Sequence, residues 1–257
     1  MILYLLIILL ILYVAFTFYR KEGFDNESEY KTFVNENIYN TFYTRIYDEL
    51  IHTIPYETKV IEIMAPLFGS NPNILCVGSR TGHIVQLLSE TAEVTGLDNS
   101  KAMVEMSKYK YPKNRYVYGD YTYKNLFQEN SYTHIICPLF TIYRVDIDSF
   151  LDVMYRWLVH KGLIGIVYFK KGFHISQIKN QEPSKSFELK YKYNIEYNNN
   201  TITEKITNTN NETRINKLEL NDISNLEQSA IDTGFKIMDT YEIPNMLNTY
   251  LLILQKS

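Results

Sequence analysis

The stretch Asn73–Asp98, NILCVGSRTGHIVQLLSETAEVTGLD, decides the fold of this chain. Ile74–Val77 is a short apolar run typical of a buried parallel strand, and a turn containing two glycines, Gly78–Gly82, follows it. A helical apolar face then leads to a second strand that ends at Asp98. This order predicts a nucleotide-binding βαβ unit, in which the turn aims backbone N–H groups at a ligand and the acid holds two ribose hydroxyls.

Strand-like and helix-like segments alternate along most of the remaining chain. The expected strands are 115–118, 132–137, 162–169, 235–241 and 249–254, and the expected helices are 100–110, 146–159 and 221–233. Residues 31–68 show helical spacing, interrupted at Pro55 and Pro66. The alternation predicts an α/β domain with a mostly parallel sheet, in which the last strand pair provides one antiparallel strand.

Residues 187–205 depart from this pattern. Polar and apolar side chains alternate on both sides of Asn198–Asn200, which predicts an antiparallel hairpin. We expect this hairpin to form part of a cap over the substrate side of the domain.

The first 19 residues, MILYLLIILLILYVAFTFY, carry no charged side chain. As a helix they would extend about 28 Å, which suits a hydrocarbon core of roughly 30 Å. A cleaved signal peptide would need a basic start and a small-residue cleavage site, and neither is present. Residues 1–19 are therefore predicted to be a single-pass transmembrane anchor. Because Arg20 and Lys21 follow it, the positive-inside rule predicts a cytosolic location for the rest of the chain.

The expected organisation is thus an anchor, a juxtamembrane linker at 20–30, and one domain at 31–257. The net charge of −3 among 257 residues indicates no strong nucleic-acid-binding surface. Cys76 and Cys137 both lie in apolar strand-like runs, and their number and spacing predict neither a disulfide framework nor a metal site. We expect a monomer with two buried thiols.

Further motifs follow the opening unit in a fixed order. They are the helix start GLDNSKAM with Asp98, the Gly119–Asp120 pair, the strand Tyr132–Cys137, the turn Leu158–Gly162 and the late Thr233–Phe235. In this order and spacing the chain resembles the class I S-adenosylmethionine-dependent methyltransferases, over about residues 47–256. The segment CPLFTIYRV also resembles, more loosely, methyltransferase-like proteins of large DNA viruses.

The resemblance implies a Rossmann-like seven-stranded sheet of order 3-2-1-4-5-7-6, with S-adenosylmethionine across the carboxyl ends of its strands. It implies nine cofactor-binding residues: Gly78, Ser79, Gly82, Asp98, Asn99, Gly119, Asp120, Tyr121 and Pro138. The glycines would admit the methionine part, Asp98 would hold the ribose, Asp120 would face the adenine amino group and Tyr121 would pack on the ring. No general base is identified, and the methyl acceptor can be a small molecule, a lipid or a protein side chain.

Three residues depart from the family pattern. Cys76 replaces the acid that helps to hold the cofactor's ammonium group, Arg80 replaces the middle glycine of the turn, and Thr133 replaces an aspartate. Arg80 can point to solvent, occupy the space of the cofactor carboxylate, or pair with that carboxylate. The departures leave a second function open, a catalytically inactive, membrane-tethered binding module. A dehydrogenase that uses NAD explains fewer of the motifs, because it accounts for neither the Gly-Asp pair nor the final antiparallel strands.

Several candidate residues have a plainer structural alternative. Asp98 can cap the helix that begins near Ser100. Asp120 can be a turn residue after Gly119, and His83 suits the first turn of a helix better than a catalytic role. Tyr43 and Tyr47 can close over the cofactor, although packing is the simpler role in a chain with 23 tyrosines.

Overall fold

The computed structural model describes residues 30–51, 54–138, 141–169, 185–198, 200–246 and 248–257. The predicted anchor at 1–19 and the linker up to residue 29 lie outside these ranges. Within the ranges, no helix is long and apolar enough to cross a membrane.

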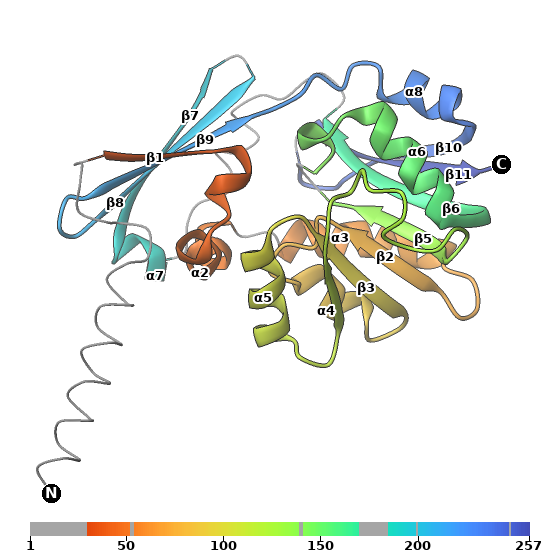
Figure 1. The fold of residues 1–257 in the computed structure, drawn as a ribbon, viewed down its shortest axis with the longest axis horizontal. Helices are drawn as coiled ribbons and strands as arrows, with labels where there is room; N and C mark the ends of the chain where they lie inside the picture. Colours follow the sequence, from red (N-terminus) through yellow and green to blue (C-terminus); the bar gives the residue numbers. More distant parts are fainter. Residues whose placement is uncertain (1–29, 52–53, 139–140, 170–184, 199, 247) are drawn as a thin grey trace, which may run out of the picture.

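A seven-stranded sheet forms the main body of the protein (Figure 1). Its strands are β2 (Asn73–Val77), β3 (Glu93–Asp98), β4 (Arg115–Tyr118), β5 (Tyr132–Cys137), β6 (Leu158–Phe169), β10 (Phe235–Glu242) and β11 (Thr249–Lys256). They lie in the order β10-β11-β6-β5-β2-β3-β4, and β11 runs antiparallel to both of its neighbours. The predicted Rossmann-like sheet, its strand order and its one antiparallel strand are confirmed.

Helices cover both faces of this sheet, because the crossovers from β2 and from β5 run in opposite directions along it. They are α3 (Ile54–Met64), α4 (His83–Leu88), α5 (Lys101–Lys110), α6 (Ile147–Trp157) and α8 (Leu226–Thr233). The Ser100 side chain accepts the Met103 N–H at 3.2 Å and so caps α5, as predicted. Asp146 caps α6 in the same way, and Gly234 ends α8 with a φ of 106°.

A second, four-stranded sheet lies apart from the main sheet, and we call it the cap sheet (Figure 1). Its strands are β1 (Tyr30–Val34), β7 (Tyr191–Asn198), β8 (Thr201–Asn208) and β9 (Thr213–Glu219), in the order β1-β9-β8-β7. The predicted hairpin is present as β7 and β8, with Asn198 opposite Thr201. It continues beyond Lys205, and Phe187 lies before it in the short helix α7 (Lys185–Glu188).

The helical prediction for residues 31–68 is wrong at its start. Residues 30–34 form β1, which pairs in parallel with β9, with Thr32 opposite Ile215. A partner this distant in the chain leaves no local periodic signal. The 3-10 helix η1 (Asn35–Ile38) follows, then α2 (Thr41–Leu50), α3, and a short 3-10 turn, η2 (Ala65–Leu67).

The helix predicted from residue 221 begins later, at Leu226. The Asn221 backbone N–H donates to the Tyr143 carbonyl at 2.7 Å, and its side chain donates to the Val145 carbonyl at 2.9 Å. These bonds tie Asn221 to the loop after β5, so it cannot also cap a helix.

Arg214 joins the cap sheet to the segment that precedes α2. Its side chain is fully buried, and its guanidinium donates to Asn216 Oδ1 at 2.7 Å, to Asn40 Oδ1 at 3.1 Å and to the Ile38 carbonyl at 2.8 Å. The guanidinium carbon also lies 3.8 Å from the centre of the Phe33 ring. Burial lowers the pKa of Arg214 to about 10, so it remains charged at neutral pH.

Arg214→Ala should lower the free energy of unfolding by about 2–4 kcal/mol, because it removes three hydrogen bonds made by a buried guanidinium. Lys217→Ala, on the exposed side of the same strand, is the matched control and should change it by less than about 0.5 kcal/mol. Urea unfolding followed by circular dichroism measures both values. Equal stability of the two variants would show that Arg214 does not hold the cap sheet in place.

Candidate functional site

A cavity lies between the carboxyl ends of β2 and β3 and the cap sheet. Its end at the main sheet, called here the sheet end, is lined by Gly78, Arg80, Asp98, Tyr121, Thr141 and Arg144. Its opposite end, called the cap end, is lined by side chains from α2 and the cap sheet, including Tyr43, Tyr193 and Glu204. The predicted cap therefore shares a cavity with three of the nine predicted cofactor residues.

Gly78 gives the sheet end a wall of bare backbone. Its N–H donates to the Leu97 carbonyl at 2.7 Å, and its φ of 77° lies in the left-handed region that favours glycine. A Cβ atom there would lie 2.2 Å from Thr141 Oγ1 and 3.0 Å from Thr141 Cγ2, so rotation of the threonine would not relieve the clash. Gly78 thus lets the Thr141 side chain pack directly against the turn at this end of the cavity.

Asp98 is 5% exposed and is held by two backbone donors. Its Oδ2 accepts the Arg80 N–H at 2.8 Å, and its Oδ1 accepts the Ser100 N–H at 2.9 Å. Burial raises the pKa of the Asp98 carboxyl, and the bonds from Ser100 and Arg80 offset part of that rise. Because the Ser100 hydroxyl itself caps α5, the Asp98 carboxylate keeps its free lone pairs for the cavity.

Arg80 lies along the cavity wall and is half-buried. Its φ of 53° is left-handed, which explains why a glycine suits this position, and its carbonyl accepts the Ser107 hydroxyl at 2.6 Å. Its guanidinium donates to Tyr56 Oη at 3.3 Å. Burial acts to lower the pKa of Arg80, but Tyr47, Tyr56 and Glu57 raise it overall. The solvent-facing orientation considered for Arg80 is therefore wrong. Arg80 instead contributes a positively charged residue to the lining of the cavity.

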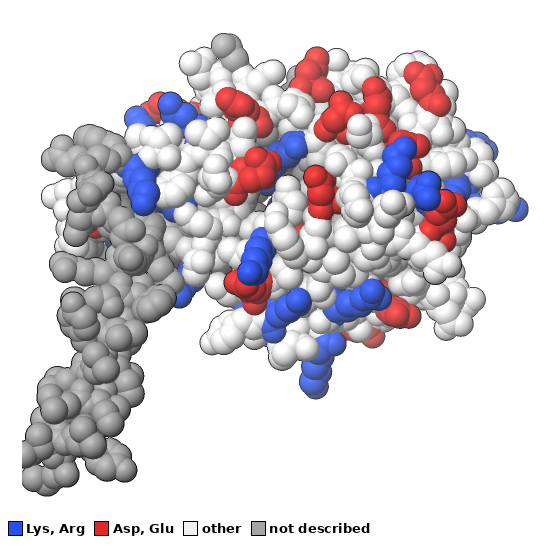
Figure 2. Space-filling model, viewed as in Figure 1, with Lys and Arg blue, Asp and Glu red and all other residues white. Residues whose placement is uncertain are grey.

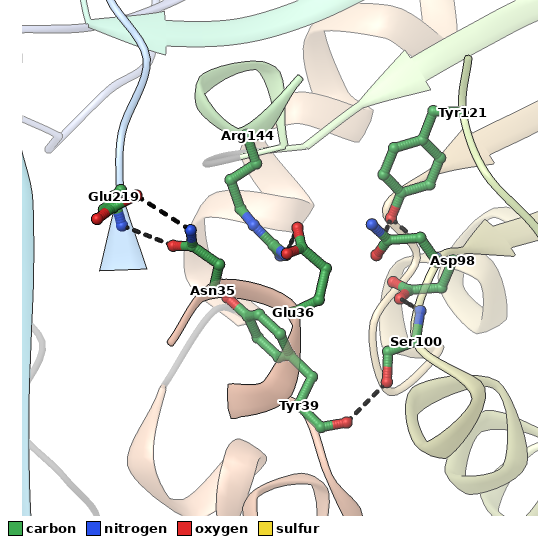
Figure 3. A network of polar contacts seen from close by, with 9 residues as sticks. Asn35, Glu36, Tyr39, Asp98, Ser100, Tyr121, Arg144 and Glu219 are labelled. Atoms are coloured by element: carbon green, nitrogen blue, oxygen red, sulfur yellow. Dashed lines mark hydrogen bonds and ion pairs between the residues drawn. The ribbon is translucent and has the colours of Figure 1, made fainter. Parts of the chain in front are cut away.

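Tyr121 closes the sheet end beside Asp98 (Figure 3). The Asn99 N–H donates to the Tyr121 hydroxyl at 3.1 Å, and that hydroxyl donates to Asn99 Oδ1 at 3.1 Å. The side chain is 4% exposed. The ring is therefore fixed where the resemblance places an aromatic neighbour of adenine.

Arg144 was missed by the sequence analysis. It comes from η3 (Ile142–Arg144), the 3-10 turn after β5, and Figure 3 shows its guanidinium next to Glu36, with Asp98 farther away on the same side. It donates to Glu36 Oε1 at 3.3 Å and lies 4.4 Å from the centre of the Tyr39 ring. Burial acts to lower the pKa of Arg144. Nearby groups raise this pKa overall, namely Tyr39, Tyr121, Glu36 and Asp98. The only sequence signal was a basic residue shortly after the fourth strand.

Asp120 lies apart from the cavity. Its side chain is exposed, and its Oδ1 accepts the N–H and the hydroxyl of Thr122, both at 2.8 Å. This is the turn role considered as the alternative. Gly119 precedes it, donates its N–H to the Asp98 carbonyl at 3.1 Å, and packs against Leu126.

Three other predicted residues do not line the cavity. Gly82 begins α4 with a φ of 86°, and a Cβ there would lie 2.6 Å from Tyr116 Oη. Ser79 is buried, and its hydroxyl has no hydrogen-bond partner within the described part of the chain. Pro138 is buried at the end of β5, while residues 139–140 lie outside the described ranges.

The other two departures from the family pattern also lie away from the cavity. Cys76 and Cys137 are free, buried thiols on the adjacent strands β2 and β5, and burial raises the pKa of both. Cys76 is therefore a neutral group. Thr133 accepts the Asn73 N–H at 2.9 Å and donates to the Asn73 carbonyl at 3.0 Å, which joins β5 to the start of β2. His83 Nδ1 lies 2.6 Å from Glu57 Oε2 in the first turn of α4.

Glu204 is the main feature of the cap end, and the sequence analysis missed it. It is 9% exposed, and its carboxylate accepts Tyr43 Oη at 2.8 Å, Tyr193 Oη at 2.9 Å and Asn216 Nδ2 at 3.0 Å. The period of two along β8 places it on the same face as the buried Ile202 and Ile206. That alternation was the available signal, an acid in phase with the apolar residues of a strand.

The face of the described residues seen in Figure 2 carries no patch of a single charge. On the face shown in Figure 2, lysine and arginine are interspersed with aspartate and glutamate. Within the described ranges, no group of three or more histidine, cysteine and acidic side chains could hold a metal ion.

Comparisons with known proteins agree with this fold. Residues 75–166 match a family described as "Methyltransferase domain". A comparison with curated proteins returns no match.

Solved structures share the fold over most of the chain. A protein of Pyrococcus horikoshii is 15% identical, with a TM-score of 0.64 over 85% of this chain and 99% of its own. The CcbJ methyltransferase of Streptomyces caelestis is 13% identical, with a TM-score of 0.63 over 87% and 99%. CalS10, an amino pentose methyltransferase solved with S-adenosylmethionine bound, is 10% identical, with a TM-score of 0.55 over 78% and 90%.

Proposed function

We propose that this chain, which carries a class I S-adenosylmethionine-dependent methyltransferase domain, transfers a methyl group to an acceptor held beneath the cap sheet. The observation that carries the proposal is the shared cavity, in which Gly78 and Asp98 face the cap end. A cofactor bound at the sheet end would then present its reactive part toward the chamber under the cap.

The residues at the sheet end fit the cofactor. Gly78 lines the cavity on the turn where the methionine part would bind, and the Asp98 carboxylate has lone pairs for two ribose hydroxyls. Tyr121 offers a ring face for adenine. When bound, S-adenosylmethionine supplies a methyl group already activated by a sulfonium sulfur. The protein's own contribution is to orient the acceptor and exclude water, and the cap sheet serves both purposes.

Arg80 is proposed to pair with the carboxylate of the cofactor. Arg80 lines the cavity on the turn that begins at Gly78, and its guanidinium stays charged at neutral pH. A guanidinium can grip a carboxylate with two parallel hydrogen bonds. The neutral Cys76 thiol cannot form an ion pair with the cofactor's ammonium group. The methionine part is therefore bound mainly through its carboxylate, by Arg80.

Asp98→Ala should weaken binding of S-adenosylhomocysteine at least tenfold, because two hydrogen bonds to a charged acceptor are lost at about 1.5–3 kcal/mol each. Glu93→Ala, an exposed acid at the opposite end of β3, is the matched control and should bind as the natural chain does. Calorimetric titration of the full chain in detergent measures all three affinities. Unaltered affinity in Asp98→Ala would remove the basis of the proposed site. Binding without methyl transfer to any acceptor fraction would point to the inactive binding module.

The role of Arg80 has its own test. Arg80→Ala should weaken S-adenosylmethionine binding about tenfold or more, yet leave the affinity for decarboxylated S-adenosylmethionine close to that of the natural chain. Only the first ligand carries the carboxylate that Arg80 would pair. If the substitution weakens both ligands equally, Arg80 acts through the shape of the turn instead.

We also propose that residues 1–19 anchor the domain to a membrane, with residues 31–257 in the cytosol. The support is the uncharged length of the segment and the basic pair Arg20–Lys21 after it. An anchored enzyme would meet its acceptor near the membrane surface.

The full chain should float with phosphatidylcholine vesicles in a density gradient, whereas a Leu9→Arg, Leu10→Arg double variant should not. Each arginine at the centre of the segment costs about 2.5–3.5 kcal/mol of insertion. Leu189→Arg, at a position 83% exposed in the domain, is the matched control and should still float. A natural chain that stays at the bottom of the gradient would overturn the anchor. Protection of the domain from protease outside sealed microsomes would overturn the cytosolic orientation.

A further inference from the structure

We propose that the methyl acceptor is a small molecule that carries an ammonium group, and that Glu204 binds this ammonium at the cap end of the cavity. The ammonium serves recognition, because its nitrogen has no lone pair with which to attack the methyl group. The inference rests on the proposed function, since it names the acceptor class for the same site. Glu204 is then a specificity residue, and Tyr43 and Tyr193 position it.

The first argument is the state of the Glu204 carboxylate. It is almost fully buried, and its three partners, Tyr43, Tyr193 and Asn216, are all neutral donors. Within the described part of the chain, no lysine, arginine or histidine forms an ion pair with it. Arg214 interacts with Glu204 electrostatically but forms no direct ion pair with it. A buried charge without a direct ion-pair partner is costly, and a cation delivered by a ligand offsets that cost.

Arg214 is the cation closest to Glu204 along the hydrogen-bond network, and its guanidinium is already hydrogen-bonded to other groups. Arg214 reaches it only through Asn216, which accepts from Arg214 Nε at 2.7 Å and donates to Glu204 at 3.0 Å. The remaining Arg214 bonds go to Asn40 and to the Ile38 carbonyl. The network therefore holds the carboxylate in place but does not neutralise it at close range.

The tyrosines provide the second argument. Tyr39, Tyr43, Tyr47 and Tyr193 all line the cavity, and Tyr43 meets both Tyr39 and Tyr47 edge to face at 5.7 and 5.9 Å. Burial, together with Glu204, raises the pKa of Tyr43 and Tyr193, so their hydroxyls stay protonated and donate. Aromatic rings around a buried carboxylate are a favourable setting for an ammonium group.

The distribution of charge along the cavity gives the third argument. Both cavity-lining arginines, Arg80 and Arg144, lie at the sheet end, where they face Asp98 and the proposed cofactor carboxylate. The cap end contributes Glu204 as its charged lining residue, beside the apolar side chains of Ile195, Ile202 and Leu218. An anionic acceptor would meet a like charge there. A compact cation with a small apolar body meets both the carboxylate and the apolar wall.

Benzylamine, benzyl alcohol and benzoate form a matched probe set, because they share one small apolar body and differ in charge. Each is titrated by calorimetry, at pH 7, into the full chain saturated with S-adenosylhomocysteine. Benzylamine should bind at least tenfold more tightly than the alcohol, and benzoate should bind most weakly. Equal or tighter binding of the alcohol or of benzoate would overturn the inference.

Glu204→Gln should reduce benzylamine affinity about tenfold and leave benzyl alcohol unchanged. Glu196→Gln, an exposed acid on the neighbouring strand β7, is the control and should preserve the preference for the amine. If Glu204→Gln fails to fold, the discrimination among the three probes by the natural chain still decides the question. A Glu204→Gln variant that keeps the amine preference would overturn the role of Glu204.

The same titrations separate this inference from the function on which it rests. Absence of S-adenosylhomocysteine binding would refute the proposed function. Tight S-adenosylhomocysteine binding without any amine preference would refute only the acceptor class.

Discussion

The wrapping of the turn Gly78–Gly82 around the Asp98 carboxylate is the constraint on which the site depends. Three alternate residues of the turn, Gly78, Arg80 and Gly82, take left-handed φ values of 77°, 53° and 86°. This path brings the Arg80 N–H within 2.8 Å of Asp98 and lets the Thr141 side chain pack directly against Gly78. An arginine is tolerated in the middle position because its backbone bond to Asp98 and its hydroxyl partner Ser107 hold the strained conformation.

The cavity needs two distant segments of the chain in addition to this turn. Its far wall comes from α2 and from the cap sheet, and β1 closes that sheet by pairing with β9. Arg214 makes the two segments one unit, because its bonds end on Ile38 and Asn40 before α2 and on Asn216 in β9. Asn216 in turn donates a hydrogen bond to Glu204. The network that holds the cap sheet in place therefore also orients the Glu204 carboxylate at the cap end of the cavity.

The main sheet was predictable because its information is local. Buried parallel strands are short apolar runs, and Ser100 and Gly234 mark helix ends by their own chemistry. The cap sheet was only half predictable: β7 and β8 alternate around a turn, but β1 exists through a partner some 180 residues away. The site divides in the same way. Asp98 and Tyr121 follow from strand order, whereas Arg144 and Glu204 enter the cavity only through tertiary packing.

The two carboxylates of the cavity illustrate why burial alone does not assign a role. Asp98 sits among backbone N–H donors with Arg80 and Arg144 close enough to favour its charge, so a neutral ligand rich in hydroxyls suits it. Glu204 has neutral donors and no ion-pair partner within the described ranges, so a cationic ligand suits it better. Because the two acids occupy opposite ends of one cavity, they favour different parts of a bound pair. A cofactor ribose at one end and an acceptor ammonium at the other would satisfy both at once, with methyl transfer between them.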